Sequence, residues 1–461
     1  MKNMTLIIGL VMLTACKKLI EIPPAPPTAI SQTAQFADSA TAMTAIAGIY
    51  SYPSNGTGGF TFNDGYLTQC TGLSSDEISV TTTQGNDFPE FYQYGVTRYT
   101  SYVLNLWEDP YYGIYPVNAA MSGIASSSGL SASFKTQLTG ELKVVRSLYN
   151  FDLVNLFGAV PLITSTDYNI NAQIGRTSVD SVYGQIITDL TQAEQVLPVA
   201  YPSQGHIRPN LYTVKAFLAK VYLYQRNWQA AYNAADTVIN SGIYALEPNL
   251  NNVFLDGSQE AIWQLPANGD YNVTKEAQNY VPYTNSTVPG YPLTTFLVNA
   301  FEAGDQRLPD WAGTSIVNTG SGNQTFYYPY KYKNVSNTAP TTEDFMIFRL
   351  GEQYLIRAEA AAELGNLGTA ISDLNTVRTR AGLGPTTAST QAALLTAIMR
   401  ERQVELFCEW GNRWFDLVRT GTAATILNAE KSGFQPYMTL YPVPNAQLQV
   451  NTMLTQNPGY N

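Results

Sequence analysis

Apolar residues recur at helical spacing along much of this chain. Between residues 131 and 157, leucine and valine return every three to five positions, and Gly158 followed by Pro161 ends the run. This pattern predicts one long helix over 131–157. Similar spacing predicts further helices over 102–127, 178–197 and 391–410.

Two other segments predict helical hairpins that match one another. Residues 213–241 divide into two helices at 226–227, and residues 344–380 divide in the same way at 365–366. At one constant offset, Ala219, Asn227, Ala231 and Val238 correspond to Ala358, Asn366, Ala370 and Val377. Small alanines let two helices approach closely, as in tetratricopeptide-type repeats. We therefore predict a mostly α fold built on a tetratricopeptide-like helical repeat scaffold.

The pattern changes between residues 244 and 342, where short apolar pieces alternate with Gly, Pro, Asn and Thr. No helical period continues there, so we predict a large irregular, loop-rich insertion; residues 56–97 have the same character. Within the insertion, FYYPYKY from Phe326 alternates like a strand or turn. Long irregular segments of compact proteins usually carry a site, and both regions are expected to face a ligand.

Charge and histidine content limit the possible chemistry. The chain has 461 residues and a formal charge of −10, and no stretch gathers enough Lys or Arg to hold phosphates, so nucleic acid is not an expected partner. The single histidine, His206, excludes multi-histidine metal sites, and any Ser-His-Asp triad would have to use it. We predict a surface position for His206, no metal and no cofactor.

The first residues predict an export signal. Lys2 is followed by an apolar stretch over residues 4–13, which has the length of a signal-peptide core and is too short to span a bilayer. The sequence LTAC, ending at Cys16, resembles the bacterial lipoprotein cleavage box, in which the cysteine is lipidated. We expect a signal peptide over 1–15 and a lipid-anchored, proline-rich spacer over 16–30. The alternative is an ordinary secretory signal with an incidental cysteine.

Two further cysteines, Cys70 and Cys408, lie far apart in the sequence. In an exported protein they could form a disulfide. A chain of this size does not need such a cross-link, which favours two buried free thiols.

Three blocks in the C-terminal part carry a specific resemblance. They read FRLGEQYLIRAEAAAELGNLGTAISDLNTVRTRAGL from Phe348, RERQVELFCEWGNRWFDLVRTG from Arg400 and LYPVPNAQLQVNTMLTQNPGY from Leu440. In this order, and with the lipoprotein box, they resemble the SusD/RagB family of outer-membrane nutrient-binding lipoproteins of Bacteroidota. The segment LWEDPYYGIYPVN from Leu106 is similar to the family's first helical repeat. One departure is Asn412, where many members carry a histidine.

The resemblance implies a single SusD-like domain over 31–461. In it, 31–243 would hold the N-terminal repeats with a ligand loop near 56–97, 244–342 would face the ligand, and 343–461 would hold the C-terminal repeat. The family implies a binding protein rather than an enzyme. It would capture an oligosaccharide, or a peptide in the RagB branch, and pass it to a SusC-like TonB-dependent transporter. We expect the protein at the outer membrane, lipid-anchored and facing the cell exterior.

Charged residues of the second block have a structural explanation. Arg402, Glu405 and Glu409 lie three or four residues apart on one predicted helical face, and alternating charges continue to Arg419. We expect these charges to satisfy one another. The alternative is a pair of glycosidase carboxylates, which would have to lie about 5–5.5 or 6.5–9.5 Å apart across an open cleft.

Aromatic rings are abundant, with 31 Tyr, 18 Phe and 6 Trp. Tyr and Trp stack well on sugar faces and lose little entropy on binding. We assign the rings at helical spacing to the core: Tyr102, Trp107, Tyr149, Tyr222, Trp228, Tyr354 and Trp414. Rings in the irregular regions could pack or bind, and Asp76 could accept sugar hydroxyls or cap a turn. The candidate ligand-binding residues are Asp76, Asn86, Tyr92, Tyr94, Tyr283, Tyr291 and Trp311.

Overall fold

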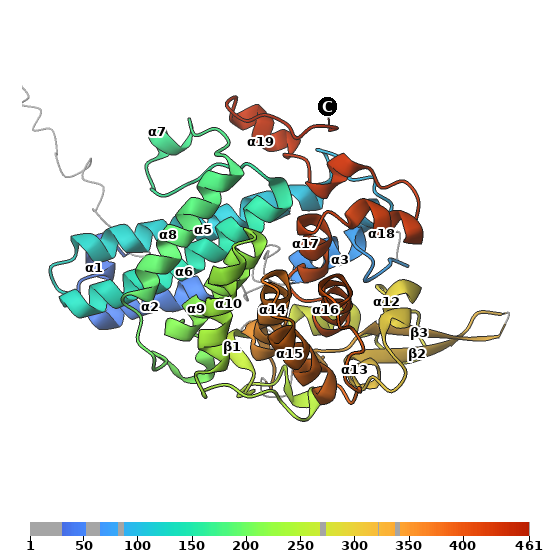
Figure 1. The fold of residues 1–461 in the computed structure, drawn as a ribbon. Coiled ribbons are helices and arrows are strands. Elements are labelled where there is room, and N and C mark those ends of the chain that lie inside the picture. The colour runs from blue at the N-terminus through green and yellow to red at the C-terminus, as the bar shows by residue number, and fades with distance from the viewer. Residues whose placement is uncertain are drawn as a thin grey trace, which may run out of the picture.

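Two long helices, α5 (Ser101–Ser126) and α6 (Ala132–Phe157), pack against one another in the N-terminal half (Figure 1). The Ser131 hydroxyl accepts the amide hydrogen of Phe134 at the start of α6, and Gly158 ends the helix with a φ of 72°. The helices predicted over 102–127 and 131–157 are confirmed. This computed structural model describes residues 30–51, 65–81, 87–267, 273–320, 322–336 and 342–460.

Shorter helices surround this pair. The third helix predicted in the N-terminal half is α8 (Val179–Glu194), which Ser178 caps and which packs on α6. The others are α1 (Gln32–Gln35), α2 (Ser39–Ser51), α3 (Leu67–Ser74), α4 (Phe88–Tyr92) and α7 (Tyr168–Asn171).

The two predicted hairpins have matching geometry. The first consists of α9 (Leu211–Tyr224) and α10 (Trp228–Ile239), and the second of α14 (Leu350–Glu363) and α15 (Leu367–Arg380). Asn227 and Asn366 occupy the same place, with φ/ψ of −84°/73° and −82°/69°, and each caps the second helix of its hairpin. The preceding residues, Arg226 and Gly365, both have positive φ, at 55° and 77°. The helical-repeat prediction is confirmed, and α10 packs on α14 to join the two hairpins.

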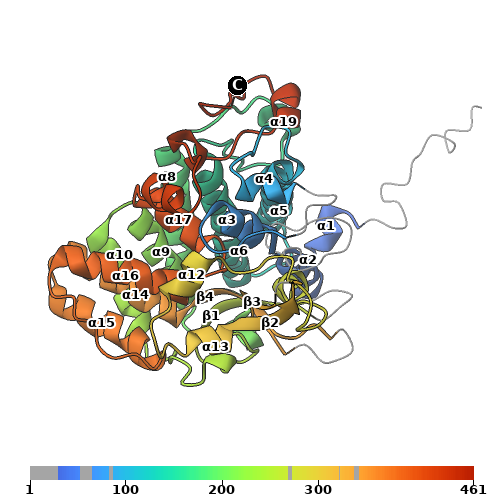
Figure 2. The same cartoon turned by 90° about the vertical axis from the view of Figure 1, so that its right-hand side faces the viewer.

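The insertion contains more regular structure than the sequence analysis allowed. Strand β1 (Ala261–Pro266) pairs antiparallel with β4 (Asp344–Arg349), and β2 (Ala312–Asn318) forms a hairpin with β3 (Asn323–Pro329). This hairpin projects from the body at the right of Figure 1, on the side that faces the viewer in Figure 2. Three short helices lie between them: α11 (Lys275–Tyr280), α12 (Thr295–Ala300) and α13 (Arg307–Trp311). The prediction of a region without helices is therefore wrong. Its α-helices and strands have five to seven residues, too few for a periodic signal to stand out.

The C-terminal part continues with α16 (Gln391–Glu405), α17 (Asn412–Arg419), α18 (Ala423–Glu430) and α19 (Asn445–Val450). The helix predicted over 391–410 ends at Glu405, so Glu409 lies beyond it. Three 3-10 turns complete the described elements: Gln204–His206, Leu250–Asn252 and Pro436–Thr439.

A buried network of ion pairs connects these segments, and it differs from the predicted one. Glu405 is fully buried and accepts hydrogen bonds from Arg307 at 2.9 Å, from Arg349 at 2.5 Å and from Arg380. None of these three arginines belongs to the block itself: they come from α13, β4 and α15. Arg402 does pair within its own block, with Asp416 at 2.6 Å. The block is structural as predicted, but its carboxylates hold the insertion and the second hairpin together.

Cys70 and Cys408 are buried free thiols, which confirms the interpretation that no disulfide joins them. Within the described ranges, no helix has both the length and the apolar character required to cross a membrane. The predicted signal peptide, Cys16 and most of the spacer lie outside the described residues.

Candidate functional site

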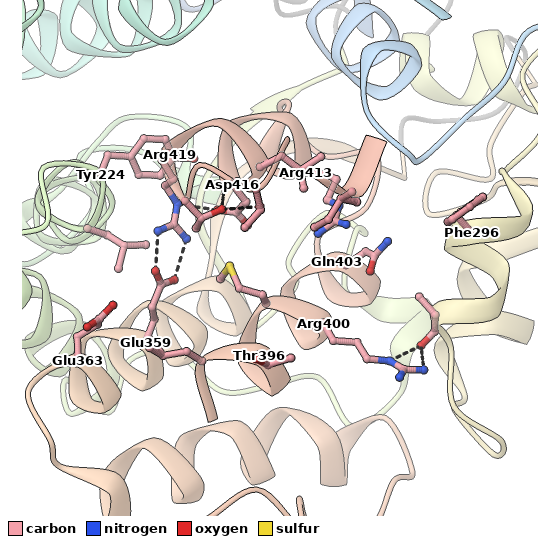
Figure 3. A pocket seen from close by; sticks show the side chains of 18 of the residues that line it. Tyr224, Phe296, Glu359, Glu363, Thr396, Arg400, Gln403, Arg413, Asp416 and Arg419 are labelled. Atoms are coloured by element: carbon pink, nitrogen blue, oxygen red, sulfur yellow. Dashed lines mark hydrogen bonds and ion pairs between the residues drawn. The ribbon is translucent and has the colours of Figure 1, made fainter. Parts of the chain in front are cut away.

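A cavity of about 880 Å³ lies where the second hairpin meets α12, α16, α17 and α18 (Figure 3). Its walls also include the turn between α9 and α10. The volume falls within the range of about 300–1,000 Å³ that is usual for ligand sites. The cavity therefore has the size of a binding site, and its surface comes from both repeat hairpins together with α12, α16, α17 and α18.

Repeat geometry explains how the rings and apolar groups reach this place. Helix α9 ends at Tyr224, the turn capped by Asn227 follows, and Trp228 begins α10 at the edge of the cavity. On the opposite side, α12 contributes Phe296, whose side chain is 39% exposed. Met399 of α16 adds apolar surface between them. Two partly exposed aromatic rings thus border the same hollow.

One side of the cavity is closed by a tight ion-pair cluster. Arg419 donates to Glu359 at 2.6 and 2.7 Å and to Asp416 at 2.8 Å. Burial alone lowers the pKa of Arg419, but attraction to these two carboxylates raises it well above its ordinary value. Burial likewise raises the pKa of Asp416, and the nearby Arg402 and Arg419 outweigh this effect and lower it. Both shifts favour the charged forms, so Arg419 and Asp416 neutralise one another.

The other side carries polar side chains that make fewer hydrogen bonds within the protein. Arg400 donates from Nε and Nη2 to the carbonyl of Ala300 at 3.1 and 3.0 Å. Gln403 donates to Asp76 at 3.1 Å. In Figure 3, Arg400, Gln403 and Phe296 lie together on this side, while Glu359 and Glu363 lie on the other. The cavity thus offers rings and hydrogen-bonding groups over an elongated surface.

Two of the predicted ligand residues are in the interior. Asp76 is 1% exposed and accepts two hydrogen bonds from Arg413, at 2.7 and 2.5 Å. Trp311 is 0% exposed, donates to the carbonyl of Leu250 at 2.9 Å and lies under the Lys331 ammonium. The prediction that they lie on a ligand surface is corrected, because both side chains are buried and find their hydrogen-bond partners within the protein.

The predicted tyrosines are dispersed. The Lys431 ammonium lies 3.9 Å from the ring centroid of Tyr92 and 4.5 Å from that of Tyr94, so it covers one face of each ring. Tyr291 is buried and packs edge-on against Phe88 at 5.6 Å. Only Tyr283 is open, at 98% exposed. Asn86 lies outside the described residues, and none of these four tyrosines lines the cavity.

Sequence reasoning missed the residues that do line it. The helical spacing of Trp228 predicts a core position, yet this residue is only partly buried and lies at the cavity edge. Phe296 belongs to the predicted ligand-facing insertion, but nothing distinguished it from other rings there. His206 is also corrected: it is half-buried, stacks on Tyr201 at 3.9 Å and lies outside the cavity.

The fold and the cavity together define an α-helical repeat protein with a ligand-sized site. The family model described as the SusD family matches residues 269–460, and one described as starch-binding associating with outer membrane matches residues 42–223. SusD-like protein P25 of Formosa agariphila is 24% identical over 418 residues, which cover 78% of this chain and 79% of the relative.

Solved structures agree with these matches. A SusD superfamily protein of Bacteroides vulgatus superposes with a TM-score of 0.82 at 20% identity, over 92% of this chain and 100% of that one. A laminarin-binding SusD-like protein superposes with a TM-score of 0.75 at 25% identity, also over 92% and 100%. The chain belongs to the SusD family, as its C-terminal blocks indicated.

Proposed function

We propose that this chain is a lipid-anchored outer-membrane protein that captures an oligosaccharide in the cavity beside α12 and passes it to a SusC-type TonB-dependent transporter. The observation that carries the proposal is the pairing of Trp228 and Phe296 with polar groups around one ligand-sized cavity. Aromatic faces stack on sugar C–H groups, and the polar groups can bond to hydroxyls. The laminarin-binding relative supports a carbohydrate as the class of ligand.

The carboxylates of the cavity support binding rather than hydrolysis. A glycosidase needs one carboxylic acid that holds a proton and a second carboxylate facing it across the bond. Asp416 has a lowered pKa, since the attraction of Arg402 and Arg419 outweighs its burial, and Glu359 is held by Arg419. Neither of these two carboxylates is free to act on a substrate. Burial raises the pKa of Glu363, the third carboxylate of the lining, but Glu363 then has no second free carboxylate to face it across a bond.

Binding of glycans tests the proposal. Affinity electrophoresis against a panel of polysaccharides should identify a ligand, and titration calorimetry should then give a Kd for oligosaccharides of that polymer. We expect the double variant Trp228→Ala, Phe296→Ala to bind at least about tenfold more weakly, because stacking on an aromatic ring contributes on the order of 1 kcal/mol or more. No reducing ends should appear during the incubation.

Tyr283→Ala is the matched control, because this exposed ring lies outside the cavity. It should leave the Kd unchanged. If Tyr283→Ala removes binding and the cavity variant keeps it, the ligand site is in the loops instead. Binding of peptides together with failure of every glycan would favour the peptide-capturing alternative. Co-purification of the lipidated protein with a TonB-dependent transporter tests the proposed transfer.

A further inference from the structure

The cavity contains an arginine whose charge the protein does not neutralise. Most arginines in the described ranges form an ion pair with a carboxylate, including Arg413 and Arg419 at this cavity. The exceptions are Arg98, Arg176, Arg226 and Arg400. Two of these four, Arg226 and Arg400, line the cavity. This concentration stands out in a chain whose formal charge is −10.

The two cavity arginines differ in their surroundings. Arg226 donates to the carbonyl of Arg419 at 3.0 Å, and its charge attracts the carboxylate of Glu363, which also lines the cavity. Glu363 therefore offsets part of this charge. Arg400 lies on the other side. Its charge lowers the pKa of Glu302, but that carboxylate is already held by Arg378 at 2.7 and 3.1 Å.

Arg400 is also held in a fixed position. Its Nε and Nη2 both donate to the carbonyl of Ala300, the last residue of α12. A guanidinium has five N–H donors, so about three remain for other partners. Phe296 precedes Ala300 by one helical turn, and Figure 3 shows its ring on the same side of the cavity as Arg400. An oriented cation and an exposed ring therefore border the same side of the cavity.

We infer that this side of the cavity binds an anionic group on a sugar, with Arg400 pairing to the anion and the Phe296 ring against the sugar face. The anion would be the carboxylate of a uronic acid or a sulfate ester, since a guanidinium donates two parallel hydrogen bonds to either. The inference rests on the proposed function and specifies its ligand class.

Matched pairs of ligands separate this inference from glycan binding in general. Oligogalacturonides are compared with their methyl-esterified forms, and dextran sulfate with dextran, by calorimetry at low and high salt. If the site binds a carboxylate, the oligogalacturonide should bind at least about tenfold tighter than its methyl ester; if it binds a sulfate, dextran sulfate should exceed dextran by the same factor. This preference for the acidic sugar should shrink as salt screens the charges. The two pairs distinguish a carboxylate from a sulfate.

Variants assign the preference to Arg400. Arg400→Gln should reduce this preference about tenfold, while Arg400→Lys should retain part of it because the charge remains. Arg98→Gln is the control, an arginine without a carboxylate partner outside the cavity. Thermal unfolding of each variant checks that the end of α12 still folds.

Three outcomes are distinguishable. Preference for the acidic sugar that Arg400→Gln removes supports the inference. Equal binding of neutral and acidic sugars, or a preference that Arg400→Gln leaves intact, overturns it while glycan capture still stands. Failure of every glycan in the panel overturns the proposed function and this inference together.

Discussion

Replacement of Glu405 by Gln tests the structural role of the buried ion network. The carboxylate is fully buried among Arg307, Arg349 and Arg380. Burial alone raises its pKa, but the three guanidinium groups outweigh that effect and hold the pKa well below its ordinary value. Gln preserves the shape and removes the charge, so the variant leaves three buried cations with one fewer partner.

The expected cost is about 3–5 kcal/mol of the free energy of unfolding, the range found when one partner of a buried ion pair is removed. The entropy of unfolding is about 2 cal/mol/K per residue, so a chain of this size should lose about 3–5 °C in Tm. Urea unfolding followed by tryptophan fluorescence, together with a thermal scan, measures both effects.

Glu194→Gln is the control, because Glu194 pairs with Lys215 at 2.5 Å at a site where both side chains are partly exposed. An exposed pair contributes about 0–1 kcal/mol, so this variant should unfold close to the wild type. Equal unfolding midpoints for Glu405→Gln, Glu194→Gln and the wild type would refute the argument that the network stabilises the fold.

Two further predictions concern packing and pH. Gly113→Ala should cost about 1–3 kcal/mol, because the added Cβ would lie 2.4 Å from the Tyr149 ring, whereas Gly184→Ala has nothing within 4 Å and should stabilise its helix by about 0.5–1 kcal/mol; a larger urea midpoint for Gly113→Ala than for Gly184→Ala would contradict this packing. Burial raises the pKa of Glu77 from 4.5 to about 8, despite the hydrogen bond that it accepts from the Cys408 amide. Because the folded pKa lies above the unfolded one, the stabilisation is complete below about pH 4.5 and is lost as the pH rises to about 8, at up to about 1.4 kcal/mol per pH unit. Urea midpoints from pH 5 to 8 should fall less steeply in Glu77→Gln, and parallel profiles would show that Glu77 is ionised throughout.

Features encoded in local sequence were predictable. Ser131 and Gly158 mark the two ends of α6, and the matching alanines and asparagines of the two hairpins place their helices and turns correctly. Capping and helical periodicity act within a few residues, so a single sequence carries them.

The cavity depends on contacts between distant segments, and no local signal predicts these. Asp76 looked available for a ligand because its partner, Arg413, comes more than three hundred residues later. Trp228 has the spacing of a core ring, and helical spacing does not reveal that a cavity lies against it. The partners of Glu405 were unpredictable for the same reason, since its three arginines come from β4, α13 and α15 rather than from its own helix.

A crystal structure of the protein with a bound oligosaccharide, chosen from the panel, tests the central claim most directly. We predict an oligosaccharide with one sugar ring stacked on Phe296, where Arg400 and Gln403 lie within hydrogen-bonding distance of its substituents, and with a second ring stacked on Trp228 at the opposite side of the cavity. A sugar bound on the loop around Tyr283, with the cavity beside α12 unchanged, would contradict the account.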